Sequence, residues 1–269
     1  MRDRTRQVVV TAAAVFMIVG TLFGTGVIGT RVEESAGGSL SATATLIAPA
    51  VPAFSIWSVI YAGLIAYVVW QWLPANADSA RLRRIAWPAA ASMVLNAAWL
   101  LVTQAGWLWV SVVVILALAV TLGELVRRLG SSQTQPVVER LLVDGTFGLY
   151  LGWTSVATAA NITATLVASG VNPPAPISEW LAVAVLAVAA GIGIMLSQVL
   201  HARIAIALAM SWGLAWIAYG RLAVDPVSLL VGVAAAVAAA VVLSVTALQR
   251  FRPGRQPVSV TVQRVGAHG

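Results

Sequence analysis

Apolar segments of membrane-spanning length dominate this sequence and leave it few possible folds. A helix needs about 20 consecutive apolar residues to cross a bilayer, and only helices and closed barrels satisfy their backbone hydrogen bonds there. Such runs lie near residues 8–29, 53–73, 86–104, 107–126, 142–168, 179–199, 203–222 and 226–248. We therefore predict an all-α, polytopic transmembrane bundle of eight helices, with a tight hairpin at Thr103, Gln104 and Gly106 between the third and the fourth.

The composition fits an integral membrane protein and excludes several kinds of chemistry. Hydrophobic residues make up 60% of the chain and charged residues 9%, against about 25% charged in a typical soluble domain. No residue is cysteine, which excludes disulfides, thiolate nucleophiles and Cys-ligated metals. All 16 basic residues are arginine, so no lysine can form a Schiff base with a ligand.

The arginines are divided unevenly between the two sides of the predicted bundle. With the N-terminus inside, only Arg31 and Arg221 fall on the outer side. An excess of arginine on one side marks the cytoplasmic face, so we predict a multi-pass protein of the bacterial inner membrane with both termini cytoplasmic. Because the arginines lie in short loops, their predicted partner is the anionic lipid bilayer and not nucleic acid.

Three segments at the edges of the apolar runs need separate interpretation. The first run follows Arg2, Arg4 and Arg6 as in a signal peptide, but its length and the lack of a clear cleavage site favour a retained helix. Residues 250–269 are polar and are predicted to be a disordered cytoplasmic tail. The outer loop 31–48, rich in Gly, Ser, Ala and Thr, is either a solvated connector or a lid over a pocket near residues 49–57.

Ionisable residues are scarce inside the apolar runs, which argues against a membrane enzyme or a proton-coupled carrier. Glu124 precedes Arg127 and Arg128 by one turn, a spacing that predicts an ion pair at the surface. Three further carboxylates lie near helix starts, where the helix dipole favours negative charge. They are Asp144, Glu179 and Asp225. We interpret these groups as structural and predict no catalytic residue.

The two histidines cannot form a haem site inside the membrane. His201 falls in a short loop and His268 in the tail, so bis-histidine ligation of haem within the bilayer is excluded. With no cysteine and no intramembrane histidine, we predict neither a metal site nor a covalent cofactor.

Aromatic and amide side chains remain as the candidates for a binding site. Six of the 11 tryptophans fall near predicted helix ends, where anchoring at the membrane interface explains them. The other five are deeper, and their roles are open between packing and ligand contact: Trp57, Trp99, Trp153, Trp212 and Trp216. Trp57 and Tyr61 are four residues apart and share a helix face.

Two intramembrane asparagines accompany these rings. Asn96 lies three residues before Trp99, and Asn161 eight residues after Trp153. An amide in hydrocarbon needs a partner from another helix, a water or a ligand, so these residues either join helices or contact a bound molecule. Two pairs of glycines, each spaced by four residues, are typical of close helix packing. They are Gly20 with Gly24 and Gly148 with Gly152.

The order and spacing of these residues resemble the tryptophan-rich sensory proteins (TspO/MBR), also called translocator proteins. The resemblance covers about residues 8–169 and rests on Phe54 to Tyr61, Leu95 to Trp99, and Trp153 to Asn161. It implies a five-helix bundle with a pocket near the first loop that binds tetrapyrroles, such as protoporphyrin or haem, or other flat apolar molecules, and a possible homodimer. The residues that it implies as ligand-binding are Trp57, Tyr61, Asn96, Trp99, Trp153, Ala157 and Asn161.

The chain also departs from the family pattern. Val51 and Pro52 replace a common Gly-Trp pair whose Trp is linked with light-dependent porphyrin breakdown, and Ala159 replaces a frequent Tyr. We therefore expect binding without photochemistry. The expected organisation is a TspO-like bundle at 1–169, three additional helices at 170–249, and the tail.

The sequence is compatible with three functions. The leading hypothesis is a membrane binding or sensory protein for tetrapyrroles or other flat apolar ligands. The alternative is a transporter or facilitator of an apolar metabolite, although the chain has no buried proton-coupling carboxylate and no nucleotide-binding loop. An enzyme would require Asp144 or Glu124 to face a cavity with a shifted pKa.

Overall fold

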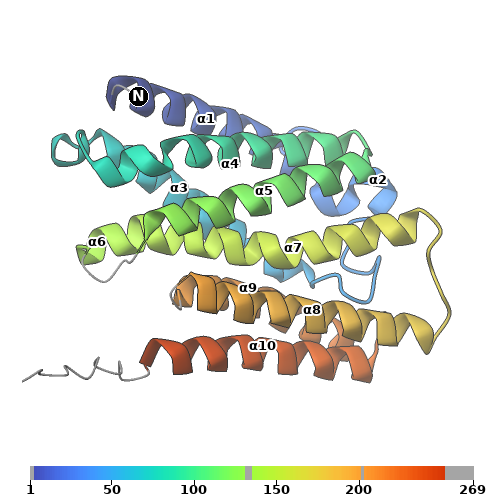
Figure 1. Cartoon of the computed structure of the whole chain (residues 1–269). Helices are drawn as coiled ribbons and strands as arrows, with labels where there is room; N and C mark the ends of the chain where they lie inside the picture. The colour runs from blue at the N-terminus through green and yellow to red at the C-terminus, as the bar shows by residue number, and fades with distance from the viewer. Residues whose placement is uncertain (1–2, 131–134, 201–202, 252–269) are drawn as a thin grey trace, which may run out of the picture.

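A computed structural model of the chain describes residues 3–130, 135–200 and 203–251, and the elements that it contains are helices (Figure 1). The long helices are α1 (Asp3–Gly24), α3 (Ile56–Trp72), α4 (Ala80–Gln104), α5 (Leu108–Leu129), α7 (Thr146–Ala168), α8 (Ile177–Val199), α9 (Ile204–Ala223) and α10 (Leu229–Phe251). Short helical turns are η1 (Val32–Glu34), α2 (Ser35–Gly38), η2 (Val51–Ser55), η3 (Pro74–Asn76), α6 (Val137–Glu139) and η4 (Arg140–Gly145). The predicted all-α, polytopic bundle is confirmed.

Seven of the long helices are long and apolar enough to span a membrane. The remaining long helix, α7, has a lower mean hydropathy than these seven, because it carries Asn161 and several threonines. Most of the predicted tail, from residue 252 onward, and His201 lie outside the described residues. The disorder of the tail therefore stays a prediction, and so does the division into a five-helix bundle and three additional helices.

Two helix boundaries differ from those predicted. Helix α4 begins at Ala80, earlier than the predicted residue 86, because its first turn is polar and hydropathy does not detect it. The Ser79 hydroxyl caps this turn by accepting a hydrogen bond from the Leu82 amide at 3.3 Å. Helix α1 ends at Gly24 and not near residue 29. The residues after it form a loop with a single β-bridge between Thr25 and Arg31.

The helices pack in a chain of neighbours that runs through the whole bundle (Figure 1). Helix α4 lies between α1 and α5, α7 between α5 and α9, and α10 between α9 and α8. Helix α3 packs on α1 and α7. Helix α1 begins and α10 ends at the same end of the bundle, whereas the loop from α1 to α3 lies at the opposite end.

The paired glycines lie where helix backbones approach most closely. A Cβ built on Gly20 would stand 2.7 Å from the Ala97 Cβ of α4, and one on Gly148 would stand 2.8 Å from the Ala205 Cβ of α9. Real Cβ atoms do not approach so closely, so these positions admit only glycine without a shift of the helices. The glycine pair of α1 thus allows close packing against α4, and the glycine pair of α7 allows close packing against α9.

Candidate functional site

Five aromatic rings meet between η2, α3 and α7 and form what we call the aromatic wall. Trp57 stacks on Tyr61 with centroids 5.2 Å apart and planes 20° from parallel, as their spacing predicts. Tyr150 and Trp153 of α7 approach the Trp57 ring edge-on, at centroid distances of 5.8 and 6.2 Å. Phe54 meets Trp153 edge-on at 5.8 Å. Phe54, Trp57 and Tyr61 are partly buried and offer apolar ring surface to a neighbouring molecule, whereas Tyr150 and Trp153 are buried behind them.

Two buried donors beside this wall have no hydrogen-bond partner among the residues that the structure describes. Asn96 of α4 accepts a hydrogen bond from the Tyr61 hydroxyl at 3.1 Å, but its Nδ2 donates to no atom. The indole Nε1 of Trp153, a residue that is only 1% exposed, is also unpaired. A buried donor left unpaired costs about 1–3 kcal/mol. Both groups would therefore gain from an acceptor on a bound molecule.

Asn161 differs from Asn96 because the protein itself satisfies its amide. Its Oδ1 accepts from the Trp99 indole Nε1 at 2.9 Å, and its Nδ2 donates to the Ser111 hydroxyl at 2.9 Å. These residues come from α7, α4 and α5 respectively. Asn161 thus joins three helices and fixes the orientation of the Trp99 ring. Both ends of its amide are paired within the protein, so its role at the site is structural support.

Two cavities adjoin the aromatic wall. The larger, of about 290 Å³, lies where α1, α3 and α4 meet the loop after α1, and Trp57, Tyr61 and Thr21 are among its lining residues. The smaller, of about 50 Å³, is lined by residues that include Trp153 and Asn161. Ligand sites commonly measure about 300–1,000 Å³, so the first is near the lower limit and the second has room only for a few waters.

All seven residues implied by the resemblance lie at or next to these cavities. Trp57, Tyr61 and Trp99 line the larger one. Trp99, Trp153, Ala157 and Asn161 line the smaller one. Asn96 lines neither and lies behind Tyr61, which it holds by the hydrogen bond described above. The structure therefore brings together residues from three helices that are far apart in the sequence, α3, α4 and α7.

Helix α9 contributes contacts that the sequence left unassigned. Trp216 meets Trp212 and Tyr219 edge-on, at centroid distances of 5.6 and 5.4 Å. The Trp212 indole donates to the carbonyl oxygen of Ala53 in η2 at 2.9 Å. This aromatic stripe thus attaches the last part of the chain to the segment that leads into α3.

Arg221 is the residue near the site that sequence reasoning missed. The topology predicted from the sequence places Arg221 on the outer side, and the structure shows it in the last turn of α9 with only 1% of its surface exposed. Its guanidinium donates to the carbonyl oxygens of Thr45 at 3.2 Å and Ala42 at 3.0 Å. The signal that could have found it is its position directly after the apolar segment that ends at Gly220, because a charge there needs a protein partner.

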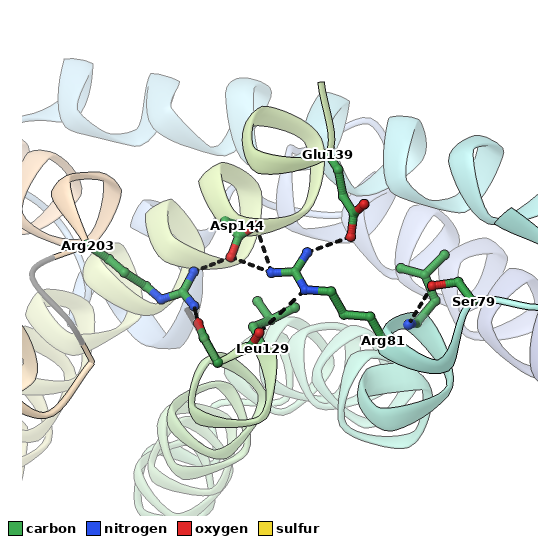
Figure 2. A network of polar contacts seen from close by, with 8 residues as sticks. Ser79, Arg81, Leu129, Glu139, Asp144 and Arg203 are labelled. Carbon is green, nitrogen blue, oxygen red and sulfur yellow. Dashed lines mark hydrogen bonds and ion pairs between the residues drawn. The ribbon is translucent and has the colours of Figure 1, made fainter. Parts of the chain in front are cut away.

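A buried cluster of charged side chains lies at the end of the bundle where α4 and α9 begin (Figure 2). Arg81 contacts Glu139 at 2.6 Å and both Asp144 carboxylate oxygens at 2.8 and 2.9 Å. Arg203 binds the same Asp144 carboxylate from the other side and also the Gly130 carbonyl oxygen. Asp144 is thus held between two arginines and is not directed into a cavity of the site, which fits its interpretation as structural.

The other predicted charge pair lies at the surface. Glu124 contacts Arg127 at 2.7 Å and Arg128 at 2.6 Å, as the one-turn spacing predicts. Within the described part of the chain, no group of three His, Cys, Asp or Glu residues could hold a metal ion.

Comparison with known proteins identifies the family. A family model described as TSPO-like protein matches residues 7–248, from the first turns of α1 to the last turn of α10. Helices α8, α9 and α10 fall inside this match, so their status as an addition to the family's fold is not confirmed. No curated protein and no solved structure matches the chain. The chain belongs to the TSPO-like protein family.

Proposed function

We propose that this membrane protein binds a tetrapyrrole, such as protoporphyrin or haem, or another flat apolar molecule against the aromatic wall. The family suggests a membrane sensory or binding protein, and the wall supplies the surface that a flat ring system needs. We place the bound molecule at the cavity lined by Trp57 and Tyr61, which lies beside the loop after α1.

The stacked Trp57–Tyr61 pair, which lines the cavity of about 290 Å³, is the observation that carries this proposal. Two buried donors without a protein partner lie near this pair: Trp153 Nε1 at the small cavity and Asn96 Nδ2 behind Tyr61. A tetrapyrrole carries nitrogen and carboxylate acceptors on a flat apolar frame. It could satisfy such donors while its ring contacts the indole and phenol faces.

Titration with protoporphyrin, followed by tryptophan fluorescence, tests the proposal. We expect saturable quenching that is weakened at least tenfold by Trp57→Ala combined with Asn96→Ala. Trp180→Ala is the matched control, because Trp180 is 61% exposed on α8 and lines none of the cavities described here. Quenching that does not saturate, or that the control weakens as much as the double variant, would reject the proposal.

The orientation in the bacterial inner membrane is part of the same proposal. We infer that both termini are cytoplasmic, because α1 begins and α10 ends at one end of the bundle (Figure 1), where Arg81 and Arg203 also lie. Since the chain has no cysteine, single-cysteine variants report the side directly. In intact cells, a membrane-impermeant maleimide should label Asn172→Cys and spare Asp78→Cys; the reverse pattern would invert the topology.

A further inference from the structure

Residues 42–50, which we call the strap, cross one end of the bundle between the short turn α2 and η2. Thr45, Ile47 and Ala48 of the strap are buried. Arg221 of α9 donates to the carbonyl oxygens of Ala42 and Thr45. The Ala50 amide donates to the Trp216 carbonyl oxygen at 3.3 Å. The strap, which contains no regular helix, is therefore attached to α9 at both of its ends.

A third cavity, of about 740 Å³, lies on the other side of the strap. It is bounded mainly by α7 and α8 and lined by apolar side chains, several of which are exposed at the surface, such as Leu181 and Val188. Two of the α7 hydroxyls that line it, those of Ser155 and Thr158, donate to carbonyl oxygens of their own helix. The cavity therefore suits an apolar molecule that arrives from the surrounding hydrocarbon.

The strap separates this cavity from the small cavity at Trp153. Thr45 lines both cavities, with Ala44, Leu46 and Ile47 facing the large one and Ala48 and Pro49 the small one. Elsewhere the partition is α7, a rigid helix: Ala157 faces the small cavity and Ala159 the large one. Since the small cavity measures about 50 Å³, no molecule larger than a few waters can reach Trp153 Nε1 there unless the partition moves.

We propose that the strap is a movable partition, that its displacement joins the two cavities, and that an apolar ligand reaches the aromatic wall from the bilayer between α7 and α8. Arg221 is the positioning residue that holds the strap closed. The inference rests on the proposed function for the identity of the ligand, but the movement of the strap does not depend on that identity. It also gives α9 a role in the binding site.

A reversible disulfide tests the movement directly. A Cβ built on Gly220 would lie 3.8 Å from the Ala50 Cβ, which matches the mean Cβ separation of about 3.8 Å in disulfides. In Gly220→Cys with Ala50→Cys, oxidation should slow protoporphyrin association and dissociation at least tenfold, and reduction should restore both rates. Each single variant, treated with the same oxidant, is the control. Equal rates in the oxidised and reduced double variant would overturn the proposal.

A second measurement needs no ligand. An apolar maleimide should label Ala159→Cys quickly and Ala157→Cys slowly, because only the first lines the large cavity. Adding Arg221→Met should speed the labelling of Ala157→Cys by about tenfold or more, since it removes hydrogen bonds from a charged donor. It should leave Ala159→Cys unchanged, and Arg221→Lys should reverse part of the effect.

The two measurements separate the two proposals. Labelling of Ala157→Cys that Arg221→Met does not change would overturn the movable strap whatever the protein binds. Accelerated labelling together with no saturable protoporphyrin quenching would support the strap and reject the tetrapyrrole as its ligand.

Discussion

Gly152 of α7 lies so close to Ile206 of α9 that a Cβ on the glycine would overlap the isoleucine carbonyl oxygen. Backbone cannot move aside as a flexible side chain can, so Gly152→Ala should force α7 and α9 apart and lower the free energy of unfolding by about 1–3 kcal/mol. SDS-induced unfolding monitored by circular dichroism would measure this loss.

Gly191→Ala on α8 is the matched control, because a Cβ there would meet no atom within 4 Å. Alanine is the better helix former by about 1 kcal/mol, so this variant should be neutral or more stable. Equal destabilisation by both substitutions would mean that α7 and α9 do not pack as closely as described.

Asp144 joins parts of the chain that are distant in sequence, because Arg81 and Arg203 both bind its carboxylate. Asp144→Asn would leave two buried guanidinium groups short of one negative charge, and removing one partner of a buried pair costs about 3–5 kcal/mol. We expect a lower Tm in detergent micelles. Glu124→Gln, in an exposed pair, is the control and should change the Tm little. Partial recovery of the Tm in Asp144→Asn with Arg203→Met would confirm that the loss comes from uncompensated charge.

The helical bundle could be predicted from the sequence because the bilayer fixes the length of a spanning apolar segment. The family could be predicted because the order and spacing of the aromatic and asparagine residues are visible in the sequence itself. A spanning helix must satisfy its own backbone, so each apolar run became a long helix. The four-residue spacing of Trp57 and Tyr61 produced a stacked pair for the same geometric reason. The one-turn spacing of Glu124 and Arg128 likewise produced an ion pair.

What the sequence did not reveal depends on contacts between distant segments. Arg221 binds the Ala42 carbonyl oxygen, 179 residues earlier in the chain, and no local pattern marks that partner. Asn96 and Asn161 look equivalent as intramembrane amides, yet only Asn161 finds partners for both ends of its amide. Hydropathy also missed the first turn of α4, because an N-terminal turn at a membrane surface is polar.

Asn161 and Asn96 should therefore respond differently to substitution. Asn161→Leu leaves the Trp99 indole and the Ser111 hydroxyl without their partner, so the free energy of unfolding should fall by about 0.6–1.7 kcal/mol, as for hydrogen bonds between membrane helices generally. Asn96→Leu gives up one hydrogen bond but also removes an unpaired donor, so its stability should change less while protoporphyrin affinity falls more. The opposite ranking in a paired unfolding and titration experiment would contradict these roles.

Trp153→Phe isolates the contribution of a single donor to binding. Phenylalanine keeps an aromatic ring against Phe54 and Trp57 but removes the buried Nε1 that has no partner in the described structure. The smaller ring leaves some space, whose cost is offset in part because an unsatisfied donor no longer has to be buried. We expect little loss of stability and a protoporphyrin affinity about 2–12-fold weaker, the range that one hydrogen bond of about 0.5–1.5 kcal/mol provides. Trp109→Phe, at an exposed indole on α5, is the control and should leave the affinity unchanged. If Trp153→Phe binds as tightly as the original chain, the indole makes no hydrogen bond to the ligand, and Asn96 alone supplies the polar contact at the aromatic wall.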